Sequence, residues 1–312
     1  MHLVDAAEVT RRLSMPAAIA AARTTFHAIF EGRVTAPPRA FYPIDALGDG
    51  AILATMPAHV SGPGGALSTK VVSIVPGNAA RDLPTIHGLI AVFDPETGVP
   101  LGVVDGTTVT AIRTAAVSGL ATELLAAPDA STVCILGTGV QGRQHVAAVR
   151  AVRPITHVRL WNRTPYRADA FASELRQQGL TVDVLATPAA AARGADIVCA
   201  CTAATQPLLT ADDIDPATHI NAVGAFTPSM RELSGSLVAS AWLAVDTREG
   251  AWEEAGDLLL AVAEGAIDRA HVQADLGELV AGAVIAPRNQ TTLFKSVGHA
   301  AEDAVTAASL LT

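Results

Sequence analysis

The sequence predicts an α/β protein in which a doubly wound parallel sheet is joined to a second, α+β domain. Three observations carry this prediction: a length of 312 residues, an alternation of short apolar runs with helical stretches after residue 130, and a glycine-rich motif at residues 137–142. At about 150 residues per domain, the length favours two domains. Short apolar runs that alternate with helices are typical of parallel strands covered on both faces.

The part of the chain before residue 130 predicts the mixed domain. Its apolar residues follow first a helical and then a strand pattern, and a tight turn joins two strands into a hairpin. The expected elements are, in order, residues 15–30 (helix), 66–75 and 86–93 (strands), 94–98 (turn), 99–104 (strand) and 108–125 (Ala-rich helix).

The part after residue 130 predicts the parallel sheet. Its helical stretches cover residues 141–153 and 165–178, and Pro165 stands at a first-turn position that tolerates proline. The expected strands are residues 132–136, 158–161, 182–185, 197–201, 219–223 and 243–245.

Composition excludes several classes of protein. Half of the residues are apolar and 16% are charged, which excludes disordered tails, collagen-like fibres and coiled-coil rods. A net charge of −9 without a basic run, together with 4% aromatic residues, argues against binding nucleic acid or an anionic membrane. We find neither a signal-peptide pattern at residues 1–5 nor an apolar stretch of spanning length, so we expect a cytoplasmic protein.

Cysteine usage is also typical of a cytoplasmic protein. The three cysteines, Cys134, Cys199 and Cys201, all lie in apolar runs. Their odd number and the lack of Cys or His partners at zinc spacing argue against a disulfide framework and a metal site. We therefore expect buried thiols.

The segment Gly137-Thr138-Gly139-Val140-Gln141-Gly142 follows a predicted strand and opens a predicted helix, as the G-x-G-x-x-G dinucleotide motif requires. Gly137 permits the tight turn, Gly139 lets the backbone approach a pyrophosphate, and Gly142 lets the helix pack on the sheet. The N–H groups at the start of the helix, which includes Val140 and Gln141, favour phosphate. The alternative is a loop that only needs glycine.

The end of the second strand indicates which dinucleotide is bound. Enzymes that prefer NAD usually have Asp or Glu there to hold the ribose 2′-hydroxyl, whereas this chain has Asn162-Arg163-Thr164. Asn162 does not repel a 2′-phosphate, Arg163 can grip one, and Thr164 adds a hydroxyl. We predict that NADP(H) is preferred over NAD(H). The alternative is that Arg163 is a solvated loop residue and that either cofactor is used.

Seven segments, in order and over nearly the whole chain, resemble the ornithine cyclodeaminase and mu-crystallin family. The Arg-Thr-Ala-Ala element after a hairpin, followed by the glycine motif, is the specific part of this combination. The segments are Met56-Pro57-Ala58, Thr69-Lys70-Val71-Val72, Ala111-Ile112-Arg113-Thr114-Ala115-Ala116, the glycine motif, Val223-Gly224-Ala225, Glu254-Ala255-Gly256-Asp257 and Phe294-Lys295-Ser296-Val297-Gly298.

The resemblance implies a discontinuous arrangement. Residues 1–118 plus 299–312 would form a substrate-binding and dimerisation domain, and the Rossmann domain, residues 119–298, would be inserted into it. The active site would lie in the cleft between the two domains, and the chain would form a homodimer.

Within the family, residues 222–230 and 294–298 look most like Δ1-pyrroline-2-carboxylate reductases. These enzymes reduce a cyclic imino acid to L-proline, and many also convert Δ1-piperideine-2-carboxylate to L-pipecolate. Bacterial ornithine cyclodeaminases carry a Glu at the place of Ala54 and a catalytic Asp at the place of Phe226. We therefore expect an NADPH-dependent reductase of a cyclic imino acid. The alternatives are an ornithine cyclodeaminase, an alanine dehydrogenase, or a non-catalytic NADPH-binding protein like the mu-crystallins.

The resemblance also implies roles for individual residues. Arg113 would clamp the substrate carboxylate with two parallel hydrogen bonds. Lys70, which has apolar neighbours, would be a second carboxylate ligand or the proton source. Arg39 matches a further substrate-binding arginine, and Phe226 would pack on the substrate methylenes or be a core aromatic. His87 is a proton relay or a structural histidine. Further implied cofactor contacts are Thr114, Thr202, Val223, Gly224, Ser296 and Gly298.

Overall fold

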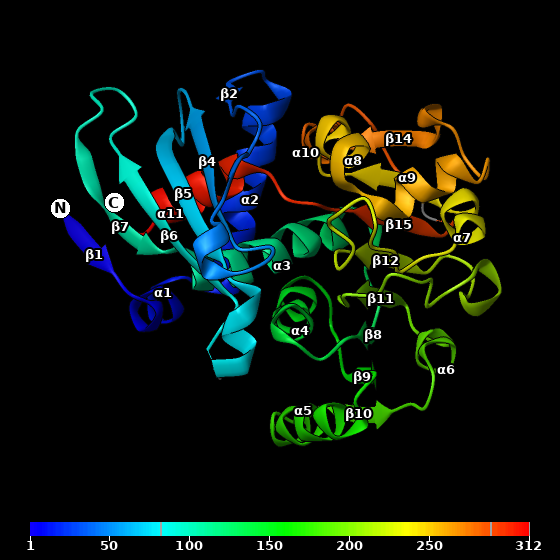
Figure 1. Cartoon of the computed structure of the whole chain (residues 1–312). Coiled ribbons are helices and arrows are strands. Elements are labelled where there is room, and N and C mark those ends of the chain that lie inside the picture. The colour runs from blue at the N-terminus through cyan, green and yellow to red at the C-terminus, as the bar shows by residue number, and fades with distance from the viewer. Residues whose placement is uncertain (82, 288, 312) are drawn as a thin grey trace. The chain divides into compact units, whose positions relative to one another are not determined.

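The computed structural model describes residues 1–81, 83–287 and 289–311 and consists of two compact units (Figure 1). Unit 1 is formed by Met1–Thr114 together with the segment that begins at His299, and unit 2 by Ala115–Gly298. The boundary expected after residue 118 therefore lies four residues beyond the one found after Thr114. That boundary lies inside one long helix, α3 (Gly106–Leu125).

Unit 1 is built on a mostly antiparallel sheet with the order β1-β7-β6-β5-β4-β2, in which β3 also pairs with β4. Only β1 runs parallel to its neighbour, β7. The strands are β1 (His2–Val4), β2 (Val34–Thr35), β3 (Ala40–Pro43), β4 (Ile52–Val60), β5 (Ala66–Ile74), β6 (Ile86–Phe93) and β7 (Pro100–Asp105). The helices are α1 (Ala6–Arg12), η1 (Asp45–Leu47), α2 (Met15–Phe30), η2 (Pro76–Arg81) and α11 (Ala300–Ala308).

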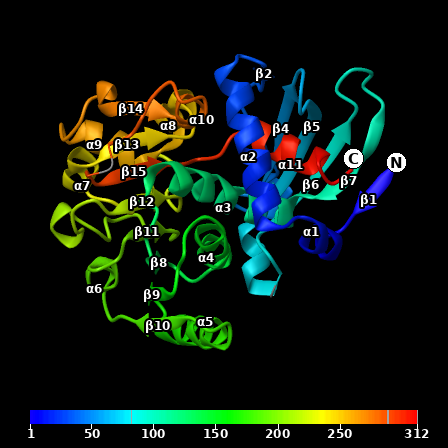
Figure 2. The same cartoon turned by 180° about the vertical axis from the view of Figure 1, so that it is seen from behind.

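The last helix completes the core of unit 1. Figures 1 and 2 both show α11, in red, beside α2 and against the sheet, where it contacts β4 and β5. Small side chains, among them Ala28, Ala66, Ala301 and Ala304, form much of this core and allow the close approach. On β5, alternate residues are buried, so Ser68, Lys70 and Val72 share the covered face.

The predicted elements of unit 1 were found, and several short strands were not foreseen. The helix at Met15–Phe30 begins after Ser14, whose hydroxyl caps it by accepting from the Ala17 N–H at 3.4 Å. Strand β4 was not predicted, because Pro57 and polar residues interrupt the alternation of apolar and polar side chains that is typical of a strand. Pro57 is tolerated because β3 pairs with residues 52–55 and β2 with residues 59–60, which leaves no partner opposite it on that side.

Unit 2 is an eight-stranded sheet with the order β10-β9-β8-β11-β12-β15-β13-β14, and all its pairs are parallel. The strands are β8 (Thr132–Leu136), β9 (His157–Trp161), β10 (Thr181–Val184), β11 (Ile197–Ala200), β12 (His219–Ala222), β13 (Trp242–Val245), β14 (Val272–Asp275) and β15 (Thr292–Lys295). The helices are α4 (Val140–Val152), α5 (Pro165–Gln177), α6 (Pro188–Ala192), η3 (Ala211–Asp213), α7 (Gly235–Ser240), α8 (Arg248–Glu254), α9 (Gly256–Ala263), η4 (Arg269–His271) and α10 (Leu276–Val280). The predicted doubly wound parallel sheet is confirmed, although β14 and β15 were not expected.

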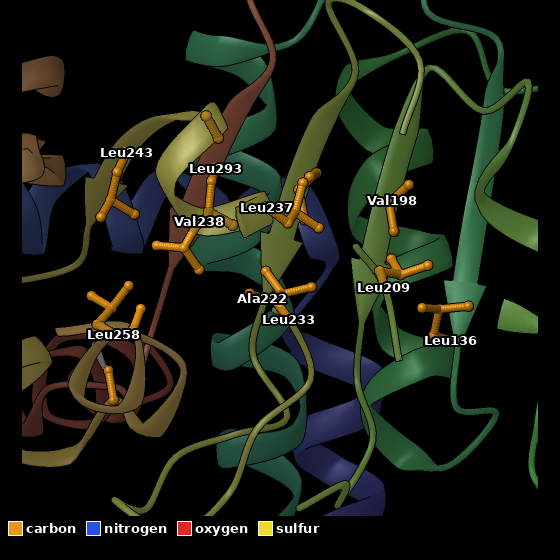
Figure 3. Close-up of a cluster of buried hydrophobic side chains, with 14 of the residues drawn as sticks. Leu136, Val198, Leu209, Ala222, Leu233, Leu237, Val238, Leu243, Leu258 and Leu293 are labelled. Atoms are coloured by element: carbon orange, nitrogen blue, oxygen red, sulfur yellow. The ribbon is translucent and has the colours of Figure 1, made fainter. Parts of the chain in front are cut away.

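Apolar side chains fill both faces of this sheet. Figure 3 shows one cluster, in which strand residues such as Leu136, Val198 and Leu293 meet Leu237 of α7 and Leu258 of α9. A second cluster joins other residues of β8, β9, β10 and β11 to α4 and α5. This double coverage is why the central strands β8 and β11 are almost entirely apolar.

The cysteines are free, as predicted. Cys134 and Cys199 are fully buried, as expected, whereas Cys201 is only half-buried. Burial raises the pKa of Cys199 to about 12. Cys134 and Cys199 are therefore inert core thiols at neutral pH.

None of the helices in the described ranges combines the length and apolar character that crossing a membrane requires.

Core packing in unit 2 generates the first prediction. Leu293 is fully buried in the cluster of Figure 3, and Leu47 of unit 1 is 51% exposed. We expect Leu293→Ala to lower the free energy of unfolding by about 2–5 kcal/mol, since it removes methyl groups and leaves a cavity. Leu47→Ala, the matched control, should change it by no more than about 0.5 kcal/mol. Urea unfolding followed by circular dichroism measures both, and equal effects would contradict the assigned core.

Candidate functional site

The glycine motif forms the turn between β8 and α4. Gly137 has a φ of +92°, and a Cβ there would lie 2.8 Å from the carbonyl oxygen of Cys201. A Cβ at Gly142 would overlap the carbonyl oxygen of Gly137, so the helix can begin only with glycine at this position. Gly139 differs from both, because nothing lies within 4 Å of a Cβ built on it. The space beside Gly139 is therefore open to a ligand.

The same turn leaves polar groups without partners. The Oγ1 of Thr138 and the Oε1 of Gln141 are buried and have no hydrogen bond within the described residues. Helix α4 begins at Gly139 without a side-chain cap, so the N–H groups of its first turn face the open space. Buried polar groups normally have partners. The Thr138 hydroxyl and these N–H groups can donate to the pyrophosphate of a dinucleotide, whereas the Gln141 Oε1 can only accept a hydrogen bond.

Asn162, Arg163 and Thr164 follow β9 beside this turn. The Oδ1 of Asn162 accepts from the Thr138 N–H at 3.1 Å, and its Nδ2 donates to the Thr164 carbonyl at 2.9 Å. Asn162 thus fixes the glycine loop against the end of β9. Arg163 is exposed, and Thr164 precedes α5 without its hydroxyl capping the helix.

The other expected cofactor residues of unit 2 lie at the ends of the central strands. Thr202 follows β11, and Val223 and Gly224 follow β12. Their loops touch, because a Cβ at Gly224 would overlap the backbone of Thr202. The carboxylate of Glu232 accepts hydrogen bonds from both loops.

Ser296 and Gly298 follow β15 and are held by one buried carboxylate. The Oδ2 of Asp246 accepts from the Ser296 hydroxyl at 3.1 Å and from the N–H groups of Val297 and Gly298 at 2.7 Å each. Asp246, at the end of β13, is 1% exposed. Thr114, the remaining expected contact, is half-buried on α3.

Unit 1 carries a second polar cluster, in which one carboxylate joins the two basic residues that the sequence singled out. The Oδ2 of Asp303 accepts from the Lys70 Nζ at 2.5 Å, and its Oδ1 accepts from the Arg113 Nε at 3.0 Å. The Arg113 Nη1 donates to the Glu302 Oε2 at 2.7 Å. All four side chains are at most 9% exposed.

Burial and the charges within this cluster shift the pKa values of Lys70 and Asp303. Burial lowers the pKa of Lys70 despite the opposing charge of Asp303, and Arg113 and Arg39 lower it further. Burial alone would raise the pKa of Asp303, but the charges of Arg113 and Lys70 outweigh it and keep that pKa below its ordinary value. Asp303 is therefore a carboxylate at neutral pH, and Lys70 releases its proton more readily than an ordinary lysine.

The start of α11 explains why two carboxylates stand side by side in an apolar helix. Glu302 and Asp303 lie in its first turn, where the helix dipole favours negative charge. Glu302 also completes a capping box, since its Oε1 accepts from the His299 N–H at 2.8 Å. The dipole and the cap thus hold both carboxylates toward Lys70 and Arg113.

Three other residues that were predicted to lie at the site, Arg39, His87 and Phe226, are not among the four side chains of this cluster. Arg39 is half-buried just before β3, close enough to influence the pKa of Lys70. His87, on β6, pairs with Ser73 of β5, so it lies on the face of the sheet opposite to Lys70. Phe226 is 50% exposed in the loop after β12, so its interpretation as a core aromatic is wrong.

Sequence reasoning missed the carboxylates that hold these basic residues and loops. They are Glu232, Asp246, Asp257, Glu302 and Asp303, all of them at most 2% exposed. The signal was present for Glu302 and Asp303, which interrupt the otherwise apolar segment from Ala300 to Ala308. No group of His, Cys, Asp or Glu within the described residues could hold a metal ion.

The geometry of unit 2 defines a class of protein. A parallel doubly wound sheet, a glycine turn after its first strand, and a buried unpaired hydroxyl at that turn are the features of a Rossmann-type dinucleotide-binding protein.

Comparison with known proteins agrees with this class. The model of the ornithine cyclodeaminase/mu-crystallin family matches residues 1–311. The ketimine reductase mu-crystallin of Mus musculus is 40% identical over 277 residues, which cover 89% of this chain and 84% of the mouse protein. The chain belongs to the ornithine cyclodeaminase/mu-crystallin family, as its motifs indicated.

Two solved structures are similar over the whole chain. One is the Δ1-pyrroline-2-carboxylate reductase of Thermococcus litoralis in complex with NADH and L-proline, with a TM-score of 0.93 and 34% identity, covering 100% of this chain and 96% of that one. The other is an archaeal alanine dehydrogenase dimer with bound NAD, with a TM-score of 0.91 and 30% identity, covering 99% and 94%.

The glycine turn generates the second prediction. Gly139→Ala should leave the melting temperature unchanged, since its φ of −74° suits alanine and no protein atom is near. It should nevertheless weaken dinucleotide binding by about tenfold or more, because the methyl group occupies the pyrophosphate space. Gly142→Ala should destabilise the protein itself, because its Cβ overlaps backbone. Calorimetry and fluorescence titration measure both effects. Normal dinucleotide affinity in Gly139→Ala would contradict the placement.

The cluster in unit 1 generates the third prediction. Asp303→Asn leaves Lys70 and Arg113 buried without their shared carboxylate, so we expect the free energy of unfolding to fall by about 3–5 kcal/mol. The control, Asp183→Asn, breaks ion pairs at a carboxylate that is 49% exposed and should cost at most about 1 kcal/mol. The double variant Lys70→Met/Asp303→Asn should regain part of the loss, because the buried ammonium is gone. Urea unfolding at pH 7 measures all three, and an equal cost at Asp303 and Asp183 would overturn the account.

Proposed function

We propose that this protein is an NADPH-dependent cyclic ketimine reductase that converts Δ1-pyrroline-2-carboxylate to L-proline and accepts the six-membered Δ1-piperideine-2-carboxylate. The chain is an NAD(P)H-dependent oxidoreductase that acts on C=N bonds, as its named relatives are. The observation that best supports a cyclic imino acid as the substrate is the buried cluster of Lys70, Arg113 and Asp303. It supplies the two things that a cyclic imino acid needs, which are a carboxylate clamp and a proton.

The clamp is Arg113. Its Nε and Nη1 already donate to Asp303 and Glu302, which fixes the plane of the guanidinium. Within the described residues Nη2 donates no hydrogen bond, so its N–H groups remain for a carboxylate ligand. An arginine held in this way has lost its side-chain freedom before substrate arrives, and binding therefore costs less entropy.

The proton comes from Lys70. Its ammonium has three N–H groups, and its Nζ donates to the Asp303 Oδ2 at 2.5 Å and to the Thr110 Oγ1 at 3.5 Å. The lowered pKa suits a group that gives a proton to an imine nitrogen at near-neutral pH. The cofactor supplies a hydride to the imine carbon, so the imino acid gains one hydride and one proton and becomes the amino acid. Activity should decline as the pH rises through the lowered pKa of Lys70.

The residues at positions 54 and 226 favour this reaction over cyclodeamination. Ala54 is 1% exposed on β4 and lies opposite Val72, on the same face of the sheet as Lys70. A glutamate there would bring a carboxylate to a second amine of the substrate, and alanine cannot. Phe226 likewise offers an apolar surface where a cyclodeaminase has an aspartate. A ring with methylenes and a single nitrogen fits these residues better than ornithine does.

The end of β9 supports NADPH as the preferred reductant. Asn162 is engaged with the glycine loop, so no carboxylate at this position repels a 2′-phosphate. The exposed Arg163 and the uncapped start of α5 add positive potential at the same place.

We also propose that the enzyme is a homodimer formed through unit 1. Large apolar side chains stand exposed on strands of its sheet, namely Leu3, Phe41, Tyr42, Ile86 and Leu89. Of these, Leu3, Tyr42 and Leu89 lie on the same face of the sheet, opposite to Lys70, and an exposed apolar face is covered in most soluble proteins. Sedimentation of the purified protein tests this point, and a monomer at micromolar concentration would contradict it.

The direct test of the function is NADPH oxidation with each imino acid. We expect consumption of NADPH and formation of L-proline or L-pipecolate. Arg113→Ala should raise the KM for the imino acid by about a hundredfold, because it removes the charge-assisted hydrogen bonds that Nη2 would donate to the substrate carboxylate. Ammonia release from ornithine, or NADH formation from alanine, in place of imine reduction would contradict the proposal. Dinucleotide binding without any turnover would favour the non-catalytic alternative.

The cofactor preference generates the fourth prediction. Arg163→Ala should raise the KM for NADPH by about tenfold or more, through loss of a charge-assisted hydrogen bond, and leave the KM for NADH unchanged. Arg193→Ala is the matched control, because Arg193 is also an exposed arginine of unit 2 and follows α6. An equal change for both cofactors in Arg163→Ala would contradict the assignment.

A further inference from the structure

A buried carboxylate lies behind the loops at the ends of the central strands of unit 2, outside every role described so far. Glu232 is fully buried, and its two oxygens accept three short hydrogen bonds. Oε1 accepts from the Thr202 N–H at 2.6 Å and from the Thr202 hydroxyl at 2.7 Å. Oε2 accepts from the Gly224 N–H at 2.7 Å.

Glu232 is itself fixed by a second buried pair. The Oδ1 of Asp257 accepts from the N–H groups of Glu232 and Leu233 at 2.7 and 2.9 Å. The Oδ2 of Asp257 accepts from the Lys295 Nζ at 2.9 Å, and the same Nζ donates to the Ala225 carbonyl at 2.6 Å. The carboxyl ends of β11, β12 and β15 are thus joined through one network of three charged side chains.

The two loops that Glu232 holds pack closely against each other and against the dinucleotide turn. Gly224 packs on the Thr202 backbone so closely that any Cβ would overlap it, and the side chain of Thr202 lies against Gly137 of the dinucleotide turn. In a doubly wound sheet the pyrophosphate lies at the turn after the first strand, and the two nucleosides extend over the two halves of the sheet. Asn162 and Arg163 mark the adenosine half at β9. The half over β11 and β12 is therefore left for the nicotinamide.

We infer that Glu232 is a positioning residue for the nicotinamide half of the cofactor: its ionised carboxylate locks the Thr202 and Gly224 loops in the form that receives the ring. The inference rests on the proposed cofactor placement. A carboxylate accepts all three hydrogen bonds with its full negative charge, whereas a protonated carboxyl or an amide is neutral and has a donor in place of one acceptor site, which weakens its hold on the two loops.

The surroundings of Glu232 bring the pKa of its carboxyl close to neutral pH. Burial raises its pKa to about 7, the charge of Asp257 adds to the rise, and Lys295 and the Thr202 donors oppose it. The other titratable groups in this network are Asp257, Lys295 and the Cys201 thiol, and the neighbouring Arg231 is paired with Glu264. Since the ionised form holds the loops, affinity for the intact cofactor should fall as the pH falls through about 7.

The experiment compares an intact cofactor with a fragment that lacks nicotinamide. Dissociation constants for NADPH and for 2′-phospho-ADP-ribose, which keeps both the 2′-phosphate and the pyrophosphate diester, are measured by fluorescence and calorimetry between pH 6 and 8. The proteins are the wild type, Glu232→Gln and the control Glu264→Gln, which alters a half-exposed glutamate of the same unit. We expect Glu232→Gln to bind NADPH about tenfold more weakly at pH 8, since a hydrogen bond to a charged group is lost. Its affinity for the fragment should change by less than about twofold.

The pH profile separates positioning from a general structural role. Between pH 8 and 6, the ratio of NADPH affinity to fragment affinity should fall in the wild type and in Glu264→Gln and stay flat in Glu232→Gln. The ratio cancels titration of the 2′-phosphate, which both ligands carry. Equal loss of both ligands in Glu232→Gln, or a flat wild-type ratio, would overturn the inference and leave the proposed function intact. A wild type that binds neither ligand would overturn the proposed function as well. If Glu232→Gln does not fold, the wild-type ratio alone decides.

Discussion

Burial of the two lysines against aspartates is the constraint on which both sites depend. The chain has only two lysines, Lys70 and Lys295, and they are 4% and 0% exposed. Lys70 is paired with Asp303 in unit 1 and Lys295 with Asp257 in unit 2. An unpaired buried ammonium is so costly that the partner carboxylate and its element must stay in place. These pairs therefore fix α11 against β5 and the start of α9 against the end of β15.

The two pairs serve different chemistry. In unit 1, Asp303 is shared between Lys70 and Arg113, so two donors are aligned before any ligand binds. In unit 2, the pair lies behind the loops and supports Glu232, which in turn holds Thr202 and Gly224. We propose that the first arrangement presents cations to a substrate and that the second shapes a backbone surface for a cofactor. Because charge is buried at both places, the electrostatic effects there are stronger than they would be in water.

Much of the fold could be predicted, because its signals are local. The apolar runs of unit 2 and the glycine motif depend on neighbouring residues only, and they identified the parallel sheet and the turn at Gly137. Asp303 and Lys70 are more than 200 residues apart, and no local pattern joins them. The resemblance to a known family named Lys70 and Arg113 but not the carboxylate that holds them. Pro57 hid β4 because its tolerance depends on the gap between β2 and β3, which only tertiary structure reveals.

The most direct test of the account follows the hydride itself. The protein is mixed with Δ1-pyrroline-2-carboxylate and NADPH that carries deuterium on the transferred position of C4, and the product is examined by mass spectrometry. The account predicts L-proline with one deuterium at C2, formed at a rate that collapses when Arg113 is replaced by alanine. Unlabelled proline, or no proline while the dinucleotide is bound, would contradict the claim that this family member reduces a cyclic imine at the Lys70–Asp303–Arg113 cluster.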